Sequence, residues 1–126
     1  MLSKENAHAT VAVKDMAVAR QFYEGTLGLQ EFSNEGPDFV AYRARGTTLF
    51  VYRSQFAGHN EATVVTWIVA DVGKTVEELK ARGVAFEHYD MLGMTREGDL
   101  HVSEDGKAKL AWFKDPDGNI HGIAPE

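Results

Sequence analysis

Hydrophobic and polar residues follow a definite order through the first half of the chain. Residues 7–13 alternate between the two faces of a predicted strand. After the potential N-cap Asp15, apolar residues recur at helical spacing up to Gly28, a residue type common at helix C-termini. Three further short strands are predicted at residues 29–32, 39–43 and 47–53.

The same order begins again after a polar, glycine-containing segment, residues 55–61. A β-branched run predicts a strand at residues 63–69, Asp71 can cap a helix, and Gly83 can end it. Later strands are predicted at residues 84–89, 107–114 and 119–124. Because the cap, the helical stripe and the closing glycine all recur, we interpret the chain as an internal repeat of strand, helix and three strands.

The second copy of this pattern carries one insertion, residues 90–106, which is polar and contains glycine. Loops of this length are usually functional or disordered. Two interpretations remain open, namely a lid over a binding cavity and a loose hairpin.

The last hairpin has the most specific sequence. A strand that includes Trp112 is followed by Lys-Asp-Pro-Asp-Gly-Asn and a short closing strand. Pro116 presets its φ angle for a turn, and Gly118 tolerates a positive φ. Together with the internal repeat, this hairpin resembles the vicinal oxygen chelate superfamily. That superfamily includes glyoxalases, bleomycin and fosfomycin resistance proteins, and extradiol dioxygenases.

The resemblance implies an α+β fold. Two tandem βαβββ modules, of about residues 1–56 and 60–126, would form a shared cup-like, partly open β-barrel cavity. The modules together would make a single glyoxalase-like domain of residues 1–126. Relatives of this length commonly dimerise, and open sheet edges leave strands that a partner can cover, so we expect a homodimer.

Composition narrows the partners and the compartment. The chain has 19 acidic residues against 13 Lys and Arg, a net charge of −6 and no basic tract. This argues against binding to nucleic acid or to an anionic membrane and favours a neutral or cationic ligand. The polar N-terminal segment and the lack of a long apolar run favour a cytoplasmic protein. Without cysteine, disulfides and thiolate metal sites are excluded.

The resemblance also implies four positions for metal ligands, on the first and last strand of each module. These positions hold His8, Phe50, Val64 (or Ala62 if the register slips by two residues) and Gly122. A catalytic transition-metal site needs about three protein ligands, and only the imidazole can coordinate. We therefore predict no metal and no other cofactor. The alternative is one divalent metal involving His8, with donors such as His101 moved into place by a rearrangement.

The strand faces opposite the helices are predicted to line the cavity. If Ala9, Val11 and Val13 pack on the helix, their neighbours face the ligand, whereas Trp67 and His121 face the helix side. The predicted ligand-binding residues are His8, Thr10, Thr48, Phe50, Tyr52, Val64, Thr66, Met91, Met94, Trp112 and Gly122. For Phe50 and Trp112 the competing interpretation is core filling.

These residues describe an aromatic, apolar pocket with a few hydroxyl groups. We expect a small-molecule-binding protein of the glyoxalase/bleomycin resistance/dioxygenase type. The alternative is a lyase, isomerase or dioxygenase of the same superfamily acting on a small oxygenated substrate. It would use either a divalent metal or His8 as general base, the best catalytic candidate, although no carboxylate lies at a helpful spacing to orient it. A third interpretation is a vestigial dimer with a closed cavity.

Overall fold

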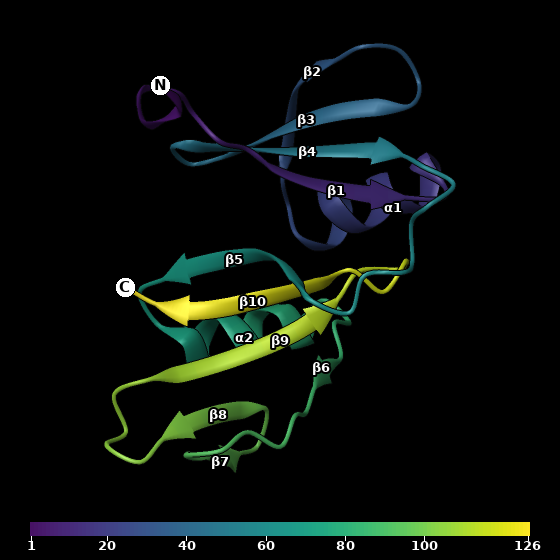
Figure 1. The fold of residues 1–126 in the computed structure, drawn as a ribbon. Helices are drawn as coiled ribbons and strands as arrows, with labels where there is room; N and C mark the ends of the chain where they lie inside the picture. The colour runs from purple at the N-terminus through teal and green to yellow at the C-terminus, as the bar shows by residue number, and fades with distance from the viewer. The chain divides into compact units, whose positions relative to one another are not determined.

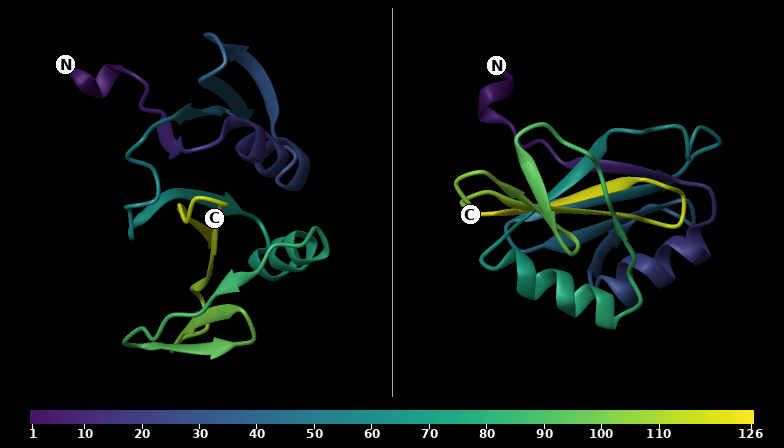
Figure 2. Two further views of the ribbon diagram at one scale, coloured as in Figure 1. Left: turned by 90° about the vertical axis from the view of Figure 1, so that its right-hand side faces the viewer. Right: turned by 90° about the horizontal axis from the view of Figure 1, so that it is seen from below.

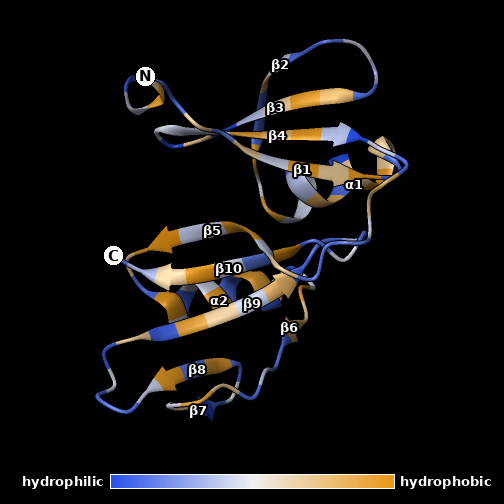
Figure 3. Cartoon of the chain, viewed as in Figure 1, coloured by the Kyte–Doolittle hydropathy of each residue, from blue (hydrophilic) through white to orange (hydrophobic).

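The computed structural model describes all 126 residues, which divide into two compact units, Met1–His59 and Asn60–Glu126. Each unit combines one β-sheet with one helical segment (Figure 1). Hydrophobic residues follow the strands, while the connecting turns are largely hydrophilic (Figure 3). This mixed architecture confirms the predicted α+β class.

The first unit contains a four-stranded sheet. Its elements are η1 (Leu2–Lys4), β1 (Ala9–Val13), α1 (Met16–Arg20), η2 (Gln21–Thr26), β2 (Gln30–Asn34), β3 (Phe39–Ala44) and β4 (Thr47–Arg53). The strand order is β1-β4-β3-β2, with β1 parallel to β4 and the other neighbours antiparallel. The Asp15 carboxylate accepts hydrogen bonds from the N–H groups of Ala17 and Val18, so it caps α1 as predicted.

The helical segment covers one face of this sheet (Figure 2). Alternate strand residues such as Val11, Val13 and Val51 are completely buried. The π-helical turn η2 continues α1 and brings the ring of Tyr23 onto Tyr42 of β3, with 6.0 Å between ring centroids. The buried alternation predicted for the first strand is therefore the helix-facing side.

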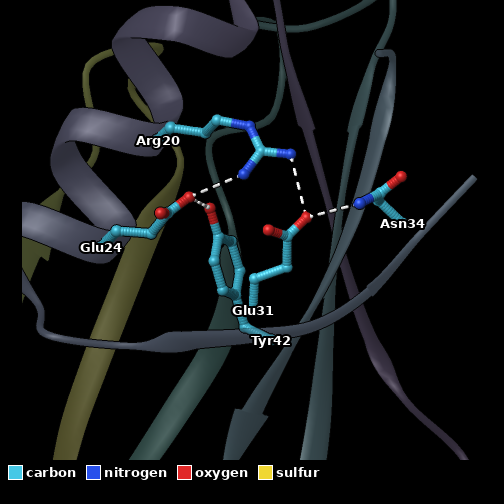
Figure 4. A network of polar contacts seen from close by, with 5 residues as sticks. All are labelled: Arg20, Glu24, Glu31, Asn34 and Tyr42. Carbon is cyan, nitrogen blue, oxygen red and sulfur yellow. Dashed lines mark hydrogen bonds and ion pairs between the residues drawn. The ribbon is translucent and has the colours of Figure 1, made fainter. Parts of the chain in front are cut away.

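A polar network fastens the helical segment to the strands (Figure 4). Glu24 accepts hydrogen bonds from Arg20 at 2.9 Å and from the Tyr42 hydroxyl at 2.7 Å. The carboxylate of Glu31 accepts from Arg20 and from Asn34. The hydrogen bond from Arg20 lowers the pKa of Glu31, whereas burial, helped by the bond to Glu24, raises the pKa of Tyr42. The network supports the helix side of the unit.

The second unit contains a six-stranded sheet. Its elements are β5 (Thr63–Val69), α2 (Val72–Ala81), β6 (Phe86–Glu87), β7 (Met94–Glu97), β8 (Leu100–Ser103), β9 (Lys109–Lys114) and β10 (Ile120–Pro125). The order is β5-β10-β9-β8-β7, and β6 also pairs with β9. As β1 does with β4, β5 runs parallel to β10.

No helix has the length and hydrophobicity that crossing a bilayer requires.

The sequence prediction of one strand at residues 84–89 was wrong in extent, and the unit has two strands more than predicted. β6 spans only two residues and covers one end of β9, opposite Phe113 and Trp112. β8 covers the other end, opposite Leu110 and Lys109. Backbone groups along the outer edge of β9 need partners, and the short β6 leaves part of that edge unpaired. The insertion supplies the rest as an ordered hairpin, β7–β8, in place of a loose one.

The predicted repeat extends to single positions of the two sheets. In the parallel pairs, Thr10 lies opposite Phe50 in the first unit, and Thr66 lies opposite Gly122 in the second. On its other side, each of these residues pairs with a residue of the neighbouring antiparallel strand. Phe50 pairs with the small Ala41, whereas Gly122 pairs with the large Trp112. Large and small residues have therefore exchanged places between the two units.

Candidate ligand-binding site

Trp112 and Gly122 form the centre of the second sheet on the face away from α2. A Cβ atom added to Gly122 would lie 3.3 Å from Nε1 of Trp112 and 3.5 Å from a methyl group of Thr63. The indole therefore occupies the space that a side chain at position 122 would need. A longer residue at this position requires the indole to move.

Trp112 belongs to an aromatic group with Tyr89 and His101. Its ring centroid lies 4.8 Å from that of His101 and 5.5 Å from that of Tyr89, both in edge-to-face geometry. His101 is on β8, directly across from Leu110 of β9, so it shares the face of Trp112. The ordered hairpin of the insertion thus completes this group.

The ring of His101 is 1% exposed, and its Nε2 accepts a hydrogen bond from the backbone N–H of Tyr89 at 3.0 Å. A nitrogen that accepts carries no proton, so the ring is neutral and its proton is on Nδ1. This Nδ1 and the hydroxyl of Tyr89 are both buried and have no hydrogen-bond partner. Two polar groups of one small cluster are therefore unsatisfied.

A cavity of about 280 Å³ lies at this cluster, within the second unit. It is lined by Tyr89, Asp90, Met91, Leu92, Met94, Thr95, Arg96 and His101. Met91 and Met94, both predicted from the sequence, come together here. Sequence reasoning considered His101 only as a remote metal donor. The signal that could have identified it is a histidine within the apolar run Leu100–Val102.

Two other residues predicted in the second unit lie elsewhere on the sheet. Val64 is half-buried and Thr66 exposed, both on β5. In the strand order, β10 and β9 separate β5 from β8, so neither residue lines the cavity. They lie on the same sheet face as Gly122, the face away from α2, because Thr66 is the partner of Gly122 in the parallel ladder.

The residues predicted in the first unit lie on the sheet face away from its helix. The ring of His8 meets Phe50 edge-on, 4.9 Å between centroids. Phe39, which the sequence analysis did not select, lies 5.1 Å from Phe50 on the other side and opposite Tyr52 in the ladder. The two-residue alternation of the strand at residues 39–44 could have identified Phe39, because it places this residue on the same face as Ala41, the partner of Phe50. Thr10 and Tyr52 are exposed, and Thr48 is half-buried.

His8 has no partner that would orient it as a general base. Its ring contacts Phe50 but makes no hydrogen bond or ion pair. A general base needs a second group to fix its tautomer and direction. The imidazole by itself therefore does not constitute a catalytic arrangement.

The donors at the four positions implied for the superfamily metal do not fit a metal centre. Only His8 offers a side-chain atom that can coordinate a metal. Val64 and Phe50 are apolar, and at Gly122 the indole of Trp112 takes the space of a side chain. Within either unit, no three histidine or carboxylate side chains are grouped to hold an ion. The metal-free state stays a prediction.

His121 lies next to Gly122 but on the opposite face, as predicted. It is fully buried and stacks on Phe113, and its Nδ1 accepts a hydrogen bond from the Trp67 indole N–H at 3.0 Å. Burial lowers the pKa of His121 to about 4, against a smaller opposing effect of Asp115. The residue is a neutral core histidine.

Comparison with known proteins agrees with this architecture. The profile of the Glyoxalase/Bleomycin resistance protein/Dioxygenase superfamily matches residues 6–121. The chain belongs to this superfamily. No curated protein matches the sequence.

Three solved structures share the fold of this chain. A member from Sphaerobacter thermophilus DSM 20745 is 25% identical, with a TM-score of 0.68 and coverage of 97% of both chains. Lactoylglutathione lyase from Agrobacterium tumefaciens is 16% identical, with a TM-score of 0.70 over 96% of this chain and 92% of that one. An antibiotic-binding protein from Streptomyces sp. CB03234 is 19% identical, with a TM-score of 0.67 over 96% and 94%.

Proposed function

We propose that this protein binds a small, largely apolar molecule and does so without the superfamily's metal ion. The observation that carries the proposal is the cavity of the second unit, which Met91 and Met94 line together with Tyr89 and His101, the two rings that pack on Trp112. Ligand pockets are mostly apolar with a few placed polar groups, and their volumes begin at roughly 300 Å³. Methionine side chains adapt to varied ligand shapes.

The Trp112–Gly122 pair supports the metal-free part of the proposal. Gly122 holds the last-strand position that the resemblance implies for a metal ligand, and the indole of Trp112 takes the space that a donor side chain would need there. His8 is left as the single donor among the four positions. One imidazole does not hold a transition metal.

The similar structures include both functional classes, an antibiotic-binding protein and a lactoylglutathione lyase. Because both are less than 20% identical to this chain, the similarity supports a shared fold and not a shared function. The alternative function is therefore a lyase, isomerase or dioxygenase, and His8 at a position of a metal ligand is the observation in its favour. The ligand-binding role of His8, Phe50 and their neighbours in the first unit stays a prediction, as does assembly into a homodimer.

Metal analysis combined with a thermal titration tests the proposal. We expect purified protein to contain no stoichiometric Zn²⁺, Ni²⁺, Mn²⁺ or Fe²⁺, and its melting temperature to be unaffected by a chelator. A specific ion at a hundredfold excess over its dissociation constant would stabilise the fold by about 2.7 kcal/mol. The variant His8→Ala is the control. A stoichiometric ion that is present in the native chain and lost from His8→Ala would contradict the proposal and favour the enzyme.

A further inference from the structure

We infer that the cavity of the second unit recognises an uncharged ligand by its carbonyl oxygen, through Nδ1–H of His101 and the hydroxyl of Tyr89. The inference rests on the proposed function and adds the chemical class of the ligand. It also assigns a role to His101, which is not one of the four positions implied for a metal ligand.

The two donors are fixed in place by the surrounding structure. The hydrogen bond from the Tyr89 N–H to Nε2 sets the tautomer of His101, so that its Nδ1 can only donate. Edge-to-face contacts with Trp112 hold both rings. Both polar atoms are buried without a partner. Leaving buried donors unpaired is unfavourable, and native proteins rarely do so without a functional reason. A carbonyl oxygen has two lone pairs and can accept from both groups.

The rest of the lining indicates the remainder of the ligand. Met91, Leu92 and Met94 provide apolar contacts for a hydrocarbon or aromatic body. Asp90 and Arg96 bring one negative and one positive charge to the same cavity, and neither forms an ion pair. The charges of the lining therefore balance, which favours an uncharged ligand over an acid or an amine.

The polar atoms are closed off from solvent in the free chain, so the ligand oxygen has to enter past flexible side chains. Met91 is 39% exposed and Leu92 is fully exposed. Met91 and Met94 have three rotatable side-chain bonds each, and they can move aside without a change in the β7–β8 ladder.

A first test needs no ligand. Tyr89→Phe removes only the unpaired hydroxyl, so we expect the melting temperature of the free protein to stay the same or rise. Tyr42→Phe is the matched contrast, because it removes a hydroxyl bonded to Glu24 at 2.7 Å and should lower the melting temperature. If Tyr89→Phe lowers the melting temperature as much as Tyr42→Phe does, the Tyr89 hydroxyl already has a structural partner and the inference is wrong.

A second test compares three molecules of nearly the same shape. They are 2-acetonaphthone, 2-isopropenylnaphthalene, in which CH₂ replaces the carbonyl oxygen, and 2-naphthoate, which carries a carboxylate. Binding is followed through ¹³C-methyl signals of methionine. The chain has four methionines, so Met91 and Met94 report on the cavity while Met1 and Met16 serve as internal controls.

We expect the ketone to shift the Met91 and Met94 signals and to bind about tenfold more tightly than the other two compounds. Tyr89→Phe should remove most of this preference. His101→Leu should do the same, because leucine has no hydrogen-bond donor. This variant also leaves the Tyr89 N–H without its acceptor, so its melting temperature is measured alongside. Tyr42→Phe should retain the preference.

The remaining outcomes separate the inference from the proposed function. If all three compounds bind equally at Met91 and Met94, the cavity binds small molecules but the carbonyl inference is wrong. Tightest binding of the carboxylate would also overturn it, because Arg96 would then determine the ligand class. If no compound shifts the two methionine signals up to its solubility limit, the cavity does not bind ligand, and both proposals fail for this site.

Discussion

At the scale of single residues, two neighbouring positions of β10 have opposite surroundings. His121 is enclosed in the helix-side core between Phe113 and Trp67, whereas Gly122 faces the other side of the sheet against Trp112. Successive side chains of a strand point to opposite faces, so position 121 packs in the core on the helix side while position 122 leaves room for the indole on the other face.

His121 should make the protein less stable in acid. Its pKa is lowered to about 4 in the folded chain from 6.5 in the unfolded chain. Because the unfolded chain takes up the proton first, the contribution of neutral His121 to the free energy of unfolding is complete above about pH 6.5. This contribution falls as the pH is lowered toward 4. The total loss is roughly 3 kcal/mol, and no further loss is expected at lower pH. The free energy of unfolding in urea between pH 8 and pH 4 measures this loss.

The variant His121→Phe is the control for this titration. It lacks the ionisable ring, so its free energy of unfolding should fall less steeply over the same pH range, even if the variant is less stable throughout. If the two pH profiles have the same slope, other groups are responsible for the acid sensitivity.

Gly122→Val should be destabilising because the added methyl groups collide with the Trp112 indole. We expect a loss of about 1–3 kcal/mol, the usual cost of overpacking a filled site, and a changed indole fluorescence spectrum. The double variant with Trp112→Leu tests the cause, since valine at position 122 should cost less when the indole is absent. Equal costs in the two backgrounds would mean that the indole is not the obstacle.

At the scale of elements, the β7–β8 hairpin is the main difference between the two units. β8 completes the outer edge of β9. Asp99 in the hairpin turn forms an ion pair with Lys80 of α2 at 2.8 Å and a hydrogen bond with the ring of His88 at 2.7 Å. The hydrogen bond with Lys80, followed by that with His88, lowers the pKa of Asp99. The turn is thereby linked to the helix and to the segment after β6.

Asp99→Asn should loosen the hairpin without unfolding the chain. We expect faster amide hydrogen exchange in residues 94–103, where the anchored turn is weakened, and unchanged exchange in β1 and β4. Because both partners of Asp99 are substantially exposed, high salt should produce a similar but smaller effect in the native chain. Glu97→Gln, which removes an exposed carboxylate without an ion pair, is the control and should leave exchange unchanged.

At the scale of the whole molecule, the outer edge of the first sheet bears on assembly. β2 is an edge strand, and all five of its residues are exposed. An unpaired edge of this kind can add a strand from another chain. We therefore predict a homodimer, and sedimentation velocity at micromolar concentration measures it. A single species with the mass of one chain, 13.9 kDa, would contradict the prediction.

The sequence by itself determined the repeated order of elements, the caps and the superfamily. The N-caps Asp15 and Asp71, the positive φ of Gly28, Gly83 and Gly118, and the helix-facing side of His121 all follow from local rules. Each of these features depends on the conformational preference of one residue or on the two-residue period of a strand. Such signals act over a few residues and can be recognised in the chain itself.

Only the tertiary structure decided which residues of distant segments meet. The insertion became a hairpin because β9 had an edge to pair, and this brought His101 against Trp112 and the backbone of Tyr89. The indole filled the space beside Gly122 because the neighbouring strand supplied a large side chain where the first unit has Ala41. Neither event has a local signal, because each depends on pairing between strands whose partners lie far apart in the sequence.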